Sequence, residues 1–233
     1  MQQGQIRVPP LSFANKVLII SCIGFFILQN IFTKFVGFPL EAYLGLSGER
    51  FFSGHLYELF TYPLMGRGLW EVLFNSLLLW FIGSDLENSW GTKRYLSFLL
   101  VAVLGAGVTY LLIYLGFLTS YAAPLTGLSG IVNFLMLAYA ILYPNRLFSF
   151  MFVFPIKAKH FCMIIIGMEV FLGVFSPMGA ISLSHLGSMA AGYAYMVYLS
   201  RPRKRPKPRG KANLYLVKDP KKGPKDDSPK YWH

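Results

Sequence analysis

Apolar residues gather in six long stretches along the chain, separated by shorter polar connections. The stretches cover residues 17–36, 69–83, 95–118, 125–143, 161–175 and 183–199. A helix needs about 20 mainly apolar residues to cross a bilayer, and in lipid its backbone must satisfy its own hydrogen bonds. The pattern therefore predicts an all-α integral membrane protein, a bundle of six transmembrane helices. The second and fifth stretches are short for a lipid-facing span and are expected to lie among partner helices.

The composition agrees with a membrane protein. Hydrophobic residues make up 55% of the chain and charged residues 14%, far less charge than a soluble domain carries. The first apolar stretch is not followed by a small-residue cleavage site, so it is expected to be a retained span. Cys22 and Cys162 lie in or beside spans, and no disulfide framework, metal site or nucleotide-binding glycine loop is indicated. No cofactor is expected.

Lysine and arginine side chains collect on one side of the predicted bundle. With six spans, that side holds Arg7, Lys16, Lys93, Arg94, Arg146, Lys157 and Lys159. The opposite side has only Arg50 and Arg67, both in the first long loop. Because positive charge stays in the cytoplasm, both termini are predicted to be cytoplasmic. Residues 1–16 would form a cytoplasmic segment and residues 17–199 the membrane domain.

The remaining residues, 200–233, have a different composition. From residue 201 onward there are 12 Lys and Arg against 3 Asp, which supplies +9 of the net charge of +12. Six prolines and few apolar residues make a folded domain there improbable, so a disordered cytoplasmic tail is expected. A basic juxtamembrane segment is attracted to anionic lipid headgroups. It lacks regular aromatic interleaving, and nucleic-acid binding is not expected.

A serine and a histidine lie near the outer ends of two predicted spans. Ser129 stands in the run Gly127-Leu128-Ser129-Gly130 at the start of the fourth, and His185 near the start of the sixth. A serine hydroxyl becomes a good nucleophile when a base lies within hydrogen-bond reach. Each residue also has a plainer interpretation, since a small serine can be a helix-packing contact and a lone histidine can be structural. Their shared depth favours a catalytic pair.

These features together resemble the rhomboid family of intramembrane serine proteases. The resemblance covers residues 17–199 and includes the Gly127–Gly130 run, His185 with Gly192, and Phe74-Asn75 on the second span. It also includes the run Gly83-Ser84-Asp85-Leu86-Glu87, then Trp90-Gly91 and Arg94, which are expected to anchor a cytoplasmic turn.

The resemblance implies a serine–histidine dyad without an acidic third member. Ser129 would be the nucleophile, and His185 the general base and acid. The backbone N–H of Ser129 and the side-chain amide of Asn75 would stabilise the oxyanion. Substrates would be single-span membrane proteins, cleaved in a transmembrane segment near the outer face.

Several positions depart from the family pattern. Glu71 stands where the family usually has a histidine that contributes to the oxyanion hole; ionised it would repel an oxyanion, and protonated it would donate to one. Asn133 replaces an aromatic ring that stacks on the histidine, and its amide is expected to hydrogen-bond and orient His185. Ser188 replaces a glycine and is expected to be tolerated. The outer-loop Trp-Arg pair is represented by Tyr57-Glu58, so its arginine is missing.

Two functions remain open. The first is an intramembrane serine endopeptidase, and the alternative is a proteolytically inactive relative that binds transmembrane clients. Glu71 favours the alternative, whereas the intact Ser129 and His185 favour the protease. Glu169, in the fifth span, needs a polar partner that the sequence does not identify. The basic loops and short chain are typical of a bacterial inner-membrane protein, although composition does not exclude an organelle.

Overall fold

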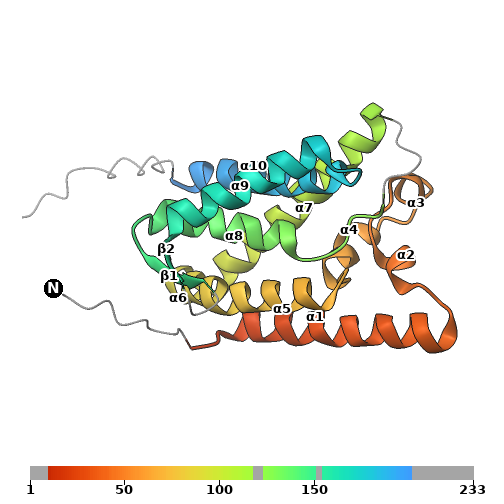
Figure 1. Cartoon of the computed structure of the whole chain (residues 1–233), viewed down its shortest axis with the longest axis horizontal. Helices are drawn as coiled ribbons and strands as arrows, with labels where there is room; N and C mark the ends of the chain where they lie inside the picture. The colour runs from red at the N-terminus through yellow and green to blue at the C-terminus, as the bar shows by residue number, and fades with distance from the viewer. Residues whose placement is uncertain (1–9, 118–122, 151–153, 201–233) are drawn as a thin grey trace, which may run out of the picture. The chain divides into compact units, whose positions relative to one another are not determined.

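Each of the six predicted apolar stretches lies largely in a helix (Figure 1). The computed structural model describes residues 10–117, 123–150 and 154–200. The elements are α1 (Phe13–Ile31), the π-helical turn η1 (Phe32–Val36), α2 (Leu40–Leu44), α3 (Gly48–Phe52), α4 (Glu58–Thr61), the 3₁₀ turn η2 (Tyr62–Leu64), α5 (Leu69–Leu78), the π-helical turn η3 (Leu79–Gly83), α6 (Ser84–Trp90), α7 (Thr92–Phe117), α8 (Ser129–Leu142), β1 (Leu147–Phe150), β2 (Phe154–Lys157), α9 (Ala158–Phe175) and α10 (Gly179–Ser200). The predictions for residues 1–9 and for the tail from residue 201 lie outside the described residues.

Four helical segments of the described chain are long and apolar enough to cross a membrane. They are Phe13–Val36, Leu69–Trp90, Thr92–Gly116 and Ala158–Phe175. Helix α8 has only 14 residues. Helix α10 has 22 residues, but Ser182, Ser184, His185 and Ser188 dilute its apolar character. The second segment, expected to be short and to end at residue 83, is instead extended by α6 to Trp90.

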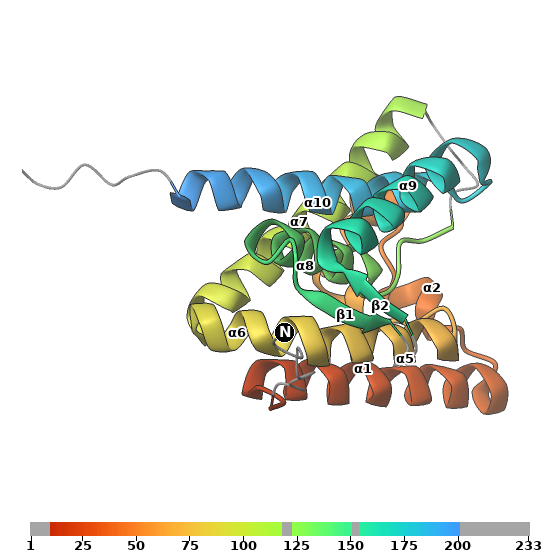
Figure 2. The ribbon, with the colours of Figure 1, turned by 60° about the vertical axis from the view of Figure 1, so that its left-hand side comes forward.

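The short helix α8 occupies the centre of the bundle. It packs against α5, η3, α7, α9 and α10, and most of its side chains are buried. Figures 1 and 2 show α1 and α5 side by side along one edge, with α9 and α10 beyond α8 on the other. Because neighbouring helices shield α8 from lipid, it is α8, rather than the second and fifth spans, that can be short.

Helix α8 begins four residues later than predicted, at Ser129 instead of residue 125. Leu125 exchanges both of its backbone hydrogen bonds with Leu46 in the outer loop, at 2.8 and 2.9 Å. Gly127 then adopts a φ of +94°, which does not belong to a right-handed helix. The backbone before Ser129 is therefore not helical. An antiparallel pair (β1 and β2) that the sequence did not predict follows α8.

Small residues allow α10 to approach α7 and α8 closely. A Cβ on Gly192 would overlap the ring of Phe134, and Gly105 faces Ala191 in the same way. Between them, Ser188 Oγ lies 3.0 Å from the carbonyl oxygens of both Ala102 and Gly130. The hydroxyl of Ser188 thus finds backbone acceptors on two neighbouring helices, and the expected tolerance for serine here has a physical basis.

At the opposite end of the bundle, Glu87 holds the start of α1. Its carboxylate accepts hydrogen bonds from Ser12 Oγ at 2.5 Å, Asn15 Nδ2 at 3.0 Å and Thr92 Oγ1 at 2.8 Å. The backbone N–H of Asn15 also points to it, at 3.4 Å. The first-turn amides of a helix have no intrahelical partner, so a carboxylate from α6 satisfies them.

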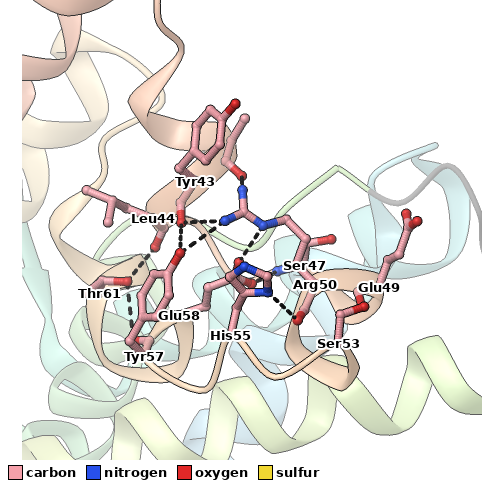
Figure 3. A network of polar contacts seen from close by, with 11 residues as sticks. Tyr43, Leu44, Ser47, Glu49, Arg50, Ser53, His55, Tyr57, Glu58 and Thr61 are labelled. Carbon is pink, nitrogen blue, oxygen red and sulfur yellow. Dashed lines mark hydrogen bonds and ion pairs between the residues drawn. The ribbon is translucent and has the colours of Figure 1, made fainter.

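An arginine from α3 organises the outer loop between α1 and α5 (Figure 3). The guanidinium of Arg50 donates to the carbonyl of Ala42 at 2.6 Å and to the hydroxyl of Tyr57 at 3.0 Å. Its Nε lies 2.9 Å from Oε1 of Glu58, and its central carbon lies 4.7 Å from the ring centre of Tyr43. The sequence has no arginine directly after Tyr57, but Arg50, from α3, supplies a guanidinium that contacts the Tyr57 side chain.

The carboxylate of Glu58 is fully buried beneath this arginine. It accepts the backbone N–H of Ser47 at 2.9 Å through one oxygen. The other oxygen pairs with Arg50 as an ion pair, without the geometry of a directed hydrogen bond. Burial raises the pKa of Glu58 above its usual value, although the Ser47 bond and the charges of Arg50 and His55 oppose the rise. Its contribution to loop stability is therefore greatest at acidic pH and falls as the pH rises through the raised pKa.

We expect Arg50→Met to destabilise the outer loop by about 3 kcal/mol at neutral pH, because it leaves a buried carboxylate without its cation. Glu58→Gln keeps the acceptor for Ser47 and should cost less. Acidification should raise the stability of the outer loop more in Arg50→Met than in wild type. Hydrogen exchange of residues 40–64 at neutral and mildly acidic pH measures both effects. Equal protection in the two variants at both pH values would contradict this account.

Candidate active site

The outer loop holds the segment that leads into Ser129. Besides the pairing of Leu125, the carbonyl of Tyr62 accepts the N–H of Gly127 at 3.0 Å. Arg67 donates to the hydroxyl of Thr126 at 3.1 Å and to its carbonyl at 3.3 Å. Three consecutive residues before the serine are thus fixed by side-chain or backbone bonds from the loop. Ser129 follows as the first residue of α8, at the positive end of the helix dipole.

The side chain of Ser129 lies between two polar residues of α5. Its hydroxyl donates to Oε1 of Glu71 at 3.0 Å and accepts from Nδ2 of Asn75 at 3.1 Å. Glu71 and Asn75 are four residues apart and share one face of α5. The structure therefore brings Ser129, Asn75, Glu71 and Gly127 together.

A small cavity of about 10 Å³ lies beside this group, lined in part by Glu71, Asn75, Gly127 and the α1 residue Cys22. A space of this size holds about one water molecule. Gly127 leaves no room to spare on its side, because a Cβ there would overlap the Glu71 carboxylate.

His185 lies in the second turn of α10, since this helix begins at Gly179, earlier than predicted. The imidazole is buried, and its Nδ1 lies 2.8 Å from Oε1 of Glu169. Its Cδ2 faces Gly130, where a Cβ would come within 3.3 Å. The Nε2 atom, bonded to Cδ2, is buried without a hydrogen-bond partner among the described residues. Among the described residues, no hydrogen bond joins Ser129 to His185. The Nε2 edge of the imidazole nevertheless lies next to Gly130, the residue that follows the serine.

The sequence predicted that the amide of Asn133 hydrogen-bonds to His185, and this prediction is wrong. The Nδ2 atom of Asn133 donates instead to Oε1 of Glu169, at 2.6 Å. The reason is that Glu169 extends from α9 into the space between α8 and α10, where a carboxylate is a stronger acceptor than an imidazole. Glu169 is thus the site residue whose role the sequence missed. Its signal was an unpaired carboxylate in an apolar helix, but its partners belong to two other helices.

Comparison with known proteins identifies the family of this chain. The family model described as "Rhomboid domain" matches residues 53–202, more than half of the chain. The chain belongs to the rhomboid family. This membership confirms the resemblance seen in the sequence, and this rhomboid is an integral multi-pass membrane protein.

A curated relative is "RHOMBOID-like protein 12, mitochondrial" of Arabidopsis thaliana. It is 24% identical to the rhomboid described here over 186 residues, which cover 74% of this chain and 54% of the relative. The chain thus spans about half the length of the curated relative that it matches.

We expect Gly127→Ala to lower the free energy of unfolding by about 2 kcal/mol or more, because it adds positive-φ strain to a clash with Glu71. Gly37→Ala is a matched control: its φ is +72°, but no atom lies near its Cβ position. Thermal unfolding in detergent measures both. In the Glu71→Ala background the Gly127→Ala cost should fall to that of Gly37→Ala, and an unchanged cost would show that the carboxylate is not the obstacle.

Proposed function

We propose that this rhomboid is an intramembrane serine endopeptidase, which cleaves transmembrane segments of single-span membrane proteins near the outer face. The proposal includes six spans with both termini in the cytoplasm. The observation that carries it is the Nε2 atom of His185, which is buried and has no hydrogen-bond partner among the residues that the structure describes; its ring edge lies beside Gly130, the residue after Ser129. A general base needs a nitrogen that is free to accept a proton, and this one lies on the ring edge that faces Gly130, the residue after the helix N-terminal serine.

In the proposed reaction, Ser129 Oγ attacks the scissile carbonyl carbon while its proton passes to Nε2 of His185. The oxyanion that forms accepts hydrogen bonds from Asn75 Nδ2 and the backbone N–H of Ser129. Nε2 then gives its proton to the amine nitrogen as the C–N bond breaks. A water molecule, deprotonated by Nε2, attacks the acyl ester, and Nε2 returns that proton to Ser129 Oγ as the ester C–O bond breaks. Each oxyanion donor is typically worth about 3–4 kcal/mol of transition-state stabilisation.

The resting hydrogen bond from Ser129 to Glu71 must break before this step. The hydroxyl would turn from Oε1 of Glu71 toward Nε2 of His185, which requires rotation about one side-chain bond. As a neutral acid, Glu71 would then be able to donate to the oxyanion beside Asn75. As a carboxylate it would repel the same charge.

If Glu71 acts as a neutral donor, Glu71→Gln and Glu71→His should both keep or raise the rate of cleavage, because each supplies an uncharged N–H donor. Glu71→Ala should lower kcat by about 100-fold, the usual cost of losing one oxyanion donor. Steady-state cleavage of a transmembrane substrate in detergent measures the three variants. Complete loss in Glu71→Gln would mean that the ionised carboxylate has a positive role.

A second candidate is a client-binding protein without protease activity. The hydrogen bond between Ser129 and Glu71 favours it, because it occupies the hydroxyl that the reaction would use. Such a protein would capture transmembrane segments equally well with or without the serine. Photo-crosslinking of a single-span client to wild type and Ser129→Ala, with no cleavage product in either, would support this reading.

The membrane in which the protein resides is a separate matter. A bacterial inner membrane, expected from the loop charges, draws no support from the comparison, since the name of the matched relative places that protein in mitochondria. Binding of anionic lipid by the basic tail is likewise part of the proposal, and rests on its charge alone.

Labelling with a fluorophosphonate probe tests the activity directly. Wild type should label and should cleave a single-span substrate, while Ser129→Ala and His185→Ala should do neither. Ser89→Ala and His160→Ala are matched controls at exposed positions away from the site, and both should behave as wild type. A folded wild type that neither labels nor cleaves any transmembrane substrate would move the assignment to the client-binding function.

A further inference from the structure

Glu169 is an acidic residue in α9, a largely apolar helix with many exposed side chains. Its neighbours on α9, Met168 and Val170, are exposed and apolar, whereas its own side chain is only 13% exposed. An ionisable group inside a membrane span is costly and calls for a partner. Here one oxygen, Oε1, has two partners: His185 Nδ1 at 2.8 Å and Asn133 Nδ2 at 2.6 Å.

The contact with Nδ1 sets the chemistry of the histidine. A carboxylate accepts, so the proton of a neutral imidazole is held on Nδ1, which leaves the lone pair on Nε2. Within the described part of the chain this nitrogen is buried and has no hydrogen-bond partner, and it lies on the ring edge that faces Gly130. A carboxylate on the far nitrogen thus prepares the near one to receive a proton from Ser129.

The amide of Asn133 holds the carboxylate in turn. It lies on α8, one turn after Ser129, so the helix that carries the nucleophile also fixes the residue that orients the base. Three helices, α8, α9 and α10, converge at this oxygen. A glutamate side chain, with its three rotatable bonds, would otherwise adopt several orientations between them.

We propose that Glu169 is a positioning residue that completes a Ser129–His185–Glu169 arrangement, with Asn133 holding its carboxylate in place. The inference rests on the proposed endopeptidase function. When Ser129 Oγ gives its proton to Nε2, the Nδ1 proton stays on the ring and Glu169 stays ionised. The carboxylate thereby stabilises the imidazolium until Nε2 passes its proton to the leaving amine.

Steady-state kinetics test the positioning role. Glu169→Gln has nearly the same shape but no charge, and we expect it to lower kcat by about 100-fold or more while KM changes by less than about twofold. Glu169→Asp should recover part of that loss, because it keeps the charge. Asn133→Ala should lower kcat by about 10-fold, since the carboxylate remains but is less well held. Met168→Ala, an exposed position on the same helix, serves as the control and should match wild type.

The tautomer of His185 gives a readout that does not depend on activity. Nitrogen NMR of ¹⁵N-histidine-labelled protein, at a pH where the ring is neutral, should show the proton on Nδ1 in wild type. In Glu169→Ala it should shift toward Nε2. A proton on Nε2 in wild type would overturn the inference, whether or not any variant is poorly folded.

The results of these experiments distinguish a failure of the positioning role of Glu169 from a failure of the proposed protease activity. An inactive wild type would defeat the proposed protease, and the tautomer would then decide the role of Glu169 alone. An active wild type with an equally active Glu169→Gln would leave the protease intact and overturn the positioning role. Loss of kcat in Glu169→Gln with recovery in Glu169→Asp would support it.

Discussion

The burial of α8 on every side is the constraint on which the rest of the structure depends. Backbone that is not helical is tolerated at membrane depth only where protein or trapped water satisfies it. The non-helical segment before Ser129 meets this condition because Leu46, Tyr62 and Arg67 form hydrogen bonds with it. A serine can then stand at the free N-terminus of a short helix, away from lipid, which a full-length span would not permit.

The two chemically interesting side chains rest in separate hydrogen-bonded groups. Ser129 is bonded to a glutamate and an asparagine of α5. His185 is bonded to a glutamate that an asparagine of α8 also contacts. In the proposed reaction, the hydroxyl of Ser129 would exchange its hydrogen bond to Glu71 for one to His185.

Local patterns in the sequence were enough to find the helices. Hydropathy located the apolar stretches that lie in helices, and it was the resemblance to rhomboids, not periodicity, that grouped Glu71 and Asn75 with Ser129. What could not be predicted depends on contacts between distant segments. The late start of α8 follows from pairing with Leu46, and the arginine of the outer loop comes from α3 rather than from the position after Tyr57.

Asn133 shows the same limit from another side. Its place on the serine-bearing face of α8 was correct, but its acceptor depended on how α9 is rotated about its own axis. Sequence periodicity does not fix that rotation for a helix that is apolar nearly all round.

Glu169 supplies the rotational information that the apolar residues of α9 lack. Apolar side chains pack against lipid tails about as favourably as against one another, so they give a membrane helix little reason to prefer one orientation. A carboxylate with two polar partners does, because turning it toward lipid would leave all three groups unsatisfied. The contact that orients His185 is thus also the contact that sets α9 against the bundle. For this reason a change at Glu169 that preserves its shape, and not simply its removal, is needed to separate the chemical contribution from the architectural one.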